Sequence, residues 1–122
     1  MNITESEQKI LMLLWKKGSL STMQITEMLS HETGWSKQAI ISFLKRMEAK
    51  GIVAYEERGR AKYYTPLIKK EDFAQKERSS FLKKFYNGKL GLMVSAMAEE
   101  NSLSQNDMKE LRDLLDRLQE KE

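Results

Sequence analysis

The sequence predicts a mainly helical protein that carries one small β-hairpin. Helix-start signals recur along the chain, at Thr4, Ser21, Ser36 and Ser104. After each of them, apolar residues return every three or four positions, which is the period of a helix with one buried face. The stretch 52–66 breaks this pattern, because it is rich in β-branched and aromatic residues on both sides of a Gly-Arg turn.

The first helix is expected to begin at Thr4 and to run to about Lys17. Thr4 and Glu7 have the spacing of a capping box, in which each side chain accepts a hydrogen bond from the backbone N–H group of the other residue. An apolar run over residues 10–15 follows. Gly18 is the expected stop, since glycine readily ends a helix.

The second helix is expected to begin at another capping box, formed by Ser21 and Gln24. The segment 31–34 contains the only histidine of the chain, His31, and is expected to break this helix. One face of the helix is expected to carry the apolar side chains of Ile25, Met28 and Leu29.

Ser36 is expected to cap a third helix that ends at Lys50 and Gly51. Its apolar face is formed by Ile40, Phe43, Leu44 and Met47. On or near the opposite face are Lys37, Gln38, Ile41, Ser42 and Lys45. Such a helix, held by its apolar face, is suited to the major groove of DNA, where glutamine pairs with adenine and apolar side chains touch thymine methyl groups. The residues expected to touch thymine are Ala39 and Ile41.

The hairpin is expected to have strands at 52–55 and 61–64, with the turn at Gly59 and with Pro66 ending the pairing. Its basic tip is suited to flank a phosphate backbone or to reach a minor groove. Helix and hairpin together predict a winged helix-turn-helix. The residues expected to contact DNA are Lys37, Gln38, Ile41, Ser42, Lys45, Arg46, Arg58, Arg60 and Lys62.

A helical dimerisation domain over residues 69–122 is expected to follow a DNA-binding domain over residues 1–68. Its three helices are expected from Lys69 to about Asn87, over 90–98, and from the cap at Ser104 onward. The leucines of the last helix have the 3, 4, 3 spacing of a coiled-coil seam. The side chains expected in the dimer contact are Phe81, Phe85, Leu90, Met93, Met97, Met108, Leu111, Leu115 and Leu118.

Composition narrows the range of functions. The 122 residues include no cysteine and a single histidine, so disulfides, thiolate clusters and multi-histidine metal sites within one chain are excluded. Neither a nucleophile–base pair nor a phosphate-binding glycine loop is present, so we expect no enzyme, no cofactor and no bound metal. No apolar run approaches the ~20 residues of a membrane span, and no signal peptide is visible. We therefore expect a cytoplasmic protein without membrane insertion.

Charge is unevenly distributed along the chain. Residues 1–98 contain 17 Lys and Arg against 10 Asp and Glu, whereas residues 99–122 contain 4 against 8. This pattern favours a body that binds a polyanion and a tail that binds protein, although a solvated, unevenly charged surface is an alternative. We expect a dimeric, sequence-specific transcriptional repressor that binds double-stranded DNA. Two alternatives stay open: a protein-interaction module with an acidic partner, and a winged-helix repressor that answers a small ligand.

The sequence resembles the BlaI/MecI penicillinase-repressor family over nearly its whole length. The most specific part is the string Trp35-Ser36-x-x-x-Ile40-x-x-x-Leu44-x-Arg46-x-x-x-Lys50-Gly51, and further matches are Gly59-Arg60-Ala61, Tyr63-Tyr64 and Leu103-Ser104. The resemblance implies a homodimer that represses from a dyad operator. In the β-lactam branch of the family, a membrane sensor-protease system triggers cleavage in the C-terminal region and so relieves repression of resistance genes.

This chain departs from the family pattern at two places. Family members commonly have threonine and a polar or basic residue where this chain has Ala39 and Ile41, so we expect a different operator sequence. The β-lactam repressors are cut at an Asn-Phe bond, and that place is held here by Ala96 and Met97. Either the protease accepts this bond or the chain answers another signal. The cysteine-based copper response of a sister branch is excluded, because this chain has no cysteine.

Overall fold

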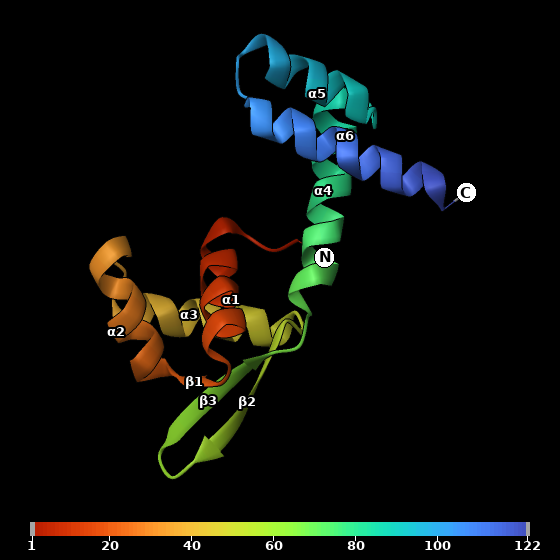
Figure 1. Ribbon diagram of the computed structural model, residues 1–122. Coiled ribbons are helices and arrows are strands. Elements are labelled where there is room, and N and C mark those ends of the chain that lie inside the picture. Colours follow the sequence, from red (N-terminus) through yellow and green to blue (C-terminus); the bar gives the residue numbers. More distant parts are fainter. Residues whose placement is uncertain (1, 122) are drawn as a thin grey trace. The chain divides into compact units, whose positions relative to one another are not determined.

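The computed structural model describes residues 2–121 and confirms a mainly helical protein with a β-hairpin (Figure 1). The chain divides into two compact units, Met1–Ala74 and Gln75–Glu122. The first unit contains α1 (Glu5–Lys17), β1 (Leu20–Ser21), α2 (Thr22–Thr33), α3 (Lys37–Ala49), β2 (Val53–Arg58) and β3 (Ala61–Pro66). Helix α4 (Lys70–Tyr86) crosses the boundary, and the second unit also contains α5 (Leu90–Glu99) and α6 (Gln105–Glu120).

The helix starts follow the local capping signals. Both hydrogen bonds of a capping box are present at the N-termini of α1, α2 and α6, with Thr4, Ser21 and Ser104 as the capping residues. At α3, the Ser36 hydroxyl accepts a hydrogen bond of 3.1 Å from the backbone N–H of Ala39. Since these bonds link residues only three positions apart, they could be predicted from the sequence.

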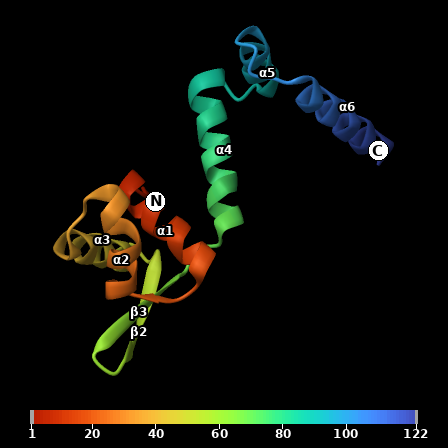
Figure 2. The same cartoon turned by 60° about the vertical axis from the view of Figure 1, so that its left-hand side comes forward.

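The small antiparallel sheet has the strand order β1-β3-β2 and therefore one strand more than predicted. Strand β1 is only two residues long, too short to leave a recognisable pattern, and it places Leu20 opposite Tyr64. The hairpin of β2 and β3 is longer than predicted. Pro66 lies opposite Val53 at its base and is the last paired position, so it ends the pairing as predicted. Figure 2 shows the hairpin extending away from α1, α2 and α3.

The core of the first unit lies between α1, α2, α3 and the sheet. Its buried apolar side chains are Ile10, Leu11, Leu14, Leu20, Ile25, Leu29, Ile40, Leu44, Met47, Ile52, Val53 and Tyr64. Trp15 and Trp35 are partly buried against this core. The indole N–H of Trp15 also donates a hydrogen bond of 2.8 Å to the carbonyl of Ile68, which fixes the segment after the hairpin to α1.

One expectation about α2 was wrong, and a second, that the segment 31–34 breaks the helix, was right only for its end. Met28 is 43% exposed, so it does not share the buried face of Ile25 and Leu29. Spacing alone suggested a common face, but burial also depends on which elements pack there. The helix also continues through His31 to Thr33 and ends at Gly34, whose φ of 75° is the left-handed conformation that glycine adopts without strain.

A partly buried ion pair joins the start of α1 to the end of α3. The Glu7 side chain is fully buried, and its Oε1 atom accepts hydrogen bonds from Lys50 Nζ at 2.7 Å and from the backbone N–H of Thr4 at 2.9 Å. The sequence indicated the capping bond but not the pairing with Lys50. Burial acts to raise the pKa of the Glu7 carboxyl, yet the hydrogen bonds from Lys50 and Thr4 and the charge of Lys50 lower it overall.

The second unit has no buried side chain among its described residues. Several large apolar side chains are at least half exposed there, namely Phe81, Phe85, Leu90, Leu115 and Leu118. An amphipathic helix usually buries its apolar face against another element, whereas these apolar side chains stay exposed among the described residues of this unit. Within residues 2–121, no helix is long and apolar enough to cross a membrane.

Candidate nucleic-acid interface

A hollow of about 540 Å³ lies between α2, α3 and the hairpin. It brings together five of the nine residues predicted to contact DNA, namely Lys37, Ile41, Lys45, Arg60 and Lys62. The other lining residues are Ser21, Thr22, Met23, Ala61, Tyr63 and Tyr64. Sequence reasoning missed Met23. The signal that could have indicated it is an apolar residue in the first turn of α2, outside the buried face of that helix.

Helix periodicity explains why α3 presents its basic side chains to the hollow. Ile40, Leu44 and Met47 are buried and hold the helix on the core. Lys37 and Lys45 lie two turns apart on the side that faces the hairpin, with Ile41 between them. Two other predicted contact residues, Gln38 and Ser42, are exposed on the next stripe of α3, outside the hollow.

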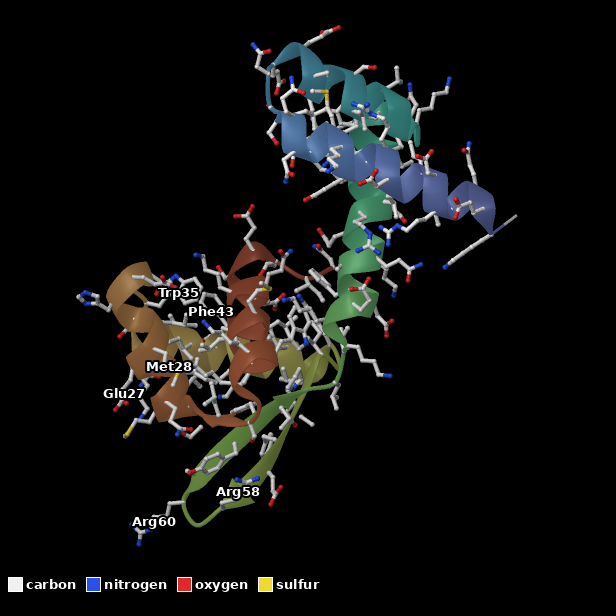
Figure 3. All side chains as sticks on the ribbon, viewed as in Figure 1. Glu27, Met28, Trp35, Phe43, Arg58 and Arg60 are labelled. Atoms are coloured by element: carbon white, nitrogen blue, oxygen red, sulfur yellow. The ribbon has the colours of Figure 1, made fainter. Side chains whose placement is uncertain are left out.

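The opposite flank of α3 carries a stack of two rings and a cation. The Trp35 and Phe43 rings meet edge to face, with centroids 5.0 Å apart, and the Arg46 guanidinium lies 5.1 Å from the Phe43 centroid. Figure 3 shows Trp35 and Phe43 close together. Stacking on an aromatic face restricts the positions of a guanidinium without removing its charge. The sequence predicted Arg46 as a contact residue but not this aromatic support.

The three cations of the hairpin have different surroundings. Arg58 lies 4.7 Å from the Tyr63 ring centroid, and its Nε atom is 3.5 Å from a Glu56 carboxylate oxygen. Lys62 lies 4.4 Å from the Tyr55 ring centroid. Arg60 follows Gly59 in the turn and makes no hydrogen bond, ion pair or ring contact with any described residue (Figure 3). Arg60 is therefore the wing cation that is most available to a ligand.

The electrostatics of the hollow suit a polyanion with an apolar edge. Four cations line it, Lys37 and Lys45 from α3 and Arg60 and Lys62 from the hairpin, and no acidic side chain is among its described lining residues. Among residues 2–121, no three His, Cys, Asp or Glu side chains gather in a way that could hold a metal ion. The exposed face of an α-helix fits the major groove of B-DNA, and adjacent cations can then contact its phosphates.

Comparisons with known proteins give a matching family model, one curated relative and two solved structures. A family model described as penicillinase repressor matches residues 3–117. The penicillinase repressor of Bacillus licheniformis is 33% identical over 114 residues, which are 93% of this chain and 89% of that protein. The solved DNA-binding domain of the repressor BlaI is 31% identical with a TM-score of 0.54, over 58% of this chain and 87% of that one. Monomeric B. licheniformis BlaI in complex with the blaP half-operator is 30% identical with a TM-score of 0.53, over 59% and 88%.

Proposed function

The chain belongs to the penicillinase-repressor family, a family of transcriptional repressors and not of enzymes, and we propose that it binds a two-fold symmetric operator as a homodimer. The observation that carries this proposal is the hollow between α3 and the wing, in which four cations and no acidic side chain meet. The related BlaI monomer, solved in complex with half-operator DNA, supports operator DNA as the ligand. The name of the relatives also suggests genes of β-lactam resistance as the target.

Eight of the nine contact residues, all except Ile41, have three roles in the proposed complex. Lys37, Lys45 and Lys62 neutralise phosphates on the side of the hollow, and Arg46 does so on the opposite flank of α3. Gln38 and Ser42 face the base edges, where hydrogen-bonding side chains distinguish base pairs. Arg58 and Arg60 extend the contact along the wing to the neighbouring backbone or minor groove.

The dimer contact is proposed to use the exposed apolar faces of α4, α5 and α6. DNA binding then belongs to residues 1–68 and dimerisation to residues 69–122. The proposed contact residues are Phe81, Phe85, Leu90, Met93, Met97, Met108, Leu111, Leu115 and Leu118. This contact links two DNA-binding domains. Once one of them has bound its half-site, the effective concentration of the other at the second half-site is high, which raises the affinity for a dyad operator.

Relief of repression is proposed to occur by cleavage between residues 90 and 103, which separates the two DNA-binding domains from α6. A membrane sensor-protease system of the kind known for the β-lactam branch is the proposed trigger. The candidate bond joins Ala96 and Met97 inside α5, and both side chains are half-buried. Because a protease binds its substrate as an extended chain, α5 must unwind locally before this bond is cut.

The proposed function is tested by selecting binding sites for the full chain from random duplex DNA at about 50 and about 200 mM salt. We expect a two-fold symmetric site with half-sites about one helical turn apart, ~34 Å. Affinity is expected to fall about 10³-fold between these salt concentrations. No enrichment would favour a protein-interaction module. A shift of the melting temperature by a small ligand would favour a ligand-responsive repressor.

Replacing both Lys45 and Arg46 by alanine is expected to weaken binding of the selected site and of unrelated duplexes alike. The slope of log affinity against log salt is expected to fall by about four, since a dimer presents each of the two cations twice. The matched control is Lys9→Ala plus Lys16→Ala, which removes two exposed cations of α1 that lie outside the hollow. An unchanged slope for the Lys45 and Arg46 variant would contradict the assignment of these residues.

The different surroundings of the wing cations give a second prediction. Arg60→Ala is expected to weaken binding about tenfold per half-site, the effect of losing one charge-assisted hydrogen bond, and so about 100-fold for the symmetric operator, because the dimer presents Arg60 twice. Arg58→Ala is expected to have a smaller effect, because Glu56 already lies near the charge of Arg58. Titration of both variants with the same operator measures the difference. Equal losses would mean that DNA displaces the Arg58 contacts with Glu56 and Tyr63.

A further inference from the structure

The hollow between α3 and the wing has an apolar floor, and we infer that this floor reads the C5-methyl groups of thymines in the operator. The inference rests on the proposed function and adds to it the chemistry of the recognised base. This floor consists of two apolar lining side chains, Ile41 from the second turn of α3 and Met23 from the first turn of α2. Because both come from helices fixed on the core, their positions are defined before DNA binds.

Neither floor residue has a structural role that explains its apolar side chain. Met23 is 59% exposed, and neither Met23 nor Ile41 belongs to the core of the first unit or packs against it. Ile41 lies between two lysines on a helix face that is otherwise polar. Two apolar side chains that line one hollow together with four cations therefore indicate a ligand that combines negative charge with an apolar group.

Thymine in duplex DNA is such a ligand. It is the only base with a methyl group in the major groove, whereas the other bases present hydrogen-bonding atoms there. With Lys37 and Lys45 on the phosphates, the edge of the groove lies over Ile41, which is between them. A cytosine at this place would bury its amino group against an apolar floor without a hydrogen-bond partner, and such burial is unfavourable.

The structure also decides between the two residues that the sequence suggested for thymine contact. Ala39 is absent from the lining of the hollow, and it lies in the first turn of α3, where its backbone N–H bonds to the Ser36 cap. Ile41 lines the hollow together with Met23. The methyl contact is therefore assigned to Ile41 and Met23, and Ala39 is left out of it.

The test begins with the operator selected for the full chain and replaces its thymines by deoxyuridine one position at a time. This exchange removes only the C5-methyl group. At one or two positions of each half-site we expect binding to weaken about four-fold, the effect of burying one methyl group. When both half-sites carry the change, we expect about 15-fold, because distant sites add. Fluorescence anisotropy at constant salt measures these constants.

A protein variant then identifies the side chain that meets the methyl group. The loss of affinity caused by deoxyuridine is called the penalty. Ile41→Ala is expected to bind the thymine and deoxyuridine operators equally, so that the penalty disappears. Ile41→Val is expected to retain part of the penalty. This variant replaces Ile41→Ala in the test if the alanine variant has a much lower melting temperature than the wild type. Met12→Ala is the matched control, since Met12 is an exposed methionine of α1 outside the hollow, and its penalty is expected to equal that of the wild type.

Two results would overturn the inference. One is that no deoxyuridine position changes binding by more than about two-fold, and the other is that Ile41→Ala weakens both operators while the penalty persists. The second result would assign the floor to the deoxyribose of the backbone. Failure of the proposed function itself is distinguishable, because the selection would then enrich no duplex at all.

Discussion

The full chain carrying Leu115→Glu and Leu118→Glu is expected to bind the symmetric operator about 10²–10⁴-fold more weakly than the wild type. Both leucines are at least half exposed on α6, and no side chain of the second unit is buried among the described residues. Two carboxylates in the proposed dimer contact lose their hydration without gaining a partner, which separates the protomers. Each DNA-binding domain then binds its half-site independently of the other.

Sedimentation equilibrium and operator titration measure this effect together. The matched control is Lys109→Glu, which changes the net charge by the same −2 but lies nine residues, or two and a half turns, from Leu118 on the opposite side of α6. The control is expected to remain a dimer with full operator affinity. Binding of a single half-site is expected to be the same for all three proteins. If the leucine variant remains a dimer, the assignment of Leu115 and Leu118 to the dimer contact is refuted.

The predictable part of this fold is the part governed by contacts between near neighbours in sequence. The caps of α1, α2, α3 and α6 involve residues three positions apart, so the sequence indicated where these helices begin. The basic face of α3 followed from the same periodicity. In contrast, β1 is defined only by its pairing with β3, more than 40 residues later, and two residues carry no pattern of their own.

The sequence indicated the charged residues of the candidate site but not the side chains that surround them. Lysines and arginines at helical spacing and at a hairpin tip are visible in the sequence. The aromatic support of Arg46 was also within reach, because Phe43 precedes it by three positions on the same helix. The contribution of Met23 could not be predicted from the sequence, since it depends on how α2 lies against α3 and the hairpin.

Lys50→Met is expected to lower the free energy of unfolding by about 3 kcal/mol or more, because it leaves the charge of Glu7 buried without its partner. The Glu7 side chain is fully buried, and its second carboxylate oxygen already has no hydrogen-bond partner among the described residues. Lys50 also donates a hydrogen bond of 2.9 Å to the carbonyl of Asn2, so the substitution releases the N-terminal segment as well. Urea unfolding at pH 7 measures the loss.

A second substitution separates the lost charge pair from lost packing. Adding Glu7→Gln to Lys50→Met is expected to recover much of the stability, because a neutral amide can be buried at lower cost than an unpaired carboxylate. The matched control is Lys45→Met, which replaces an exposed lysine of α3 without a salt bridge among the described residues, and its effect on stability is expected to be small. If the double variant were as unstable as Lys50→Met, packing of the lysine stem would be the cause.

The pH dependence of stability follows from the same pair. In the wild type the pKa of Glu7 lies below its ordinary value of 4.5, so its stabilisation is complete above pH 4.5 and is lost as pH falls through the folded-state pKa. In Lys50→Met, burial without a partner raises that pKa above the unfolded value. The destabilisation from the unpaired carboxylate is then greatest at neutral pH and disappears as the pH falls and Glu7 takes up a proton. The gap in stability between wild type and Lys50→Met is therefore expected to narrow from pH 7 toward pH 4, and a gap independent of pH would contradict the buried charge as its cause.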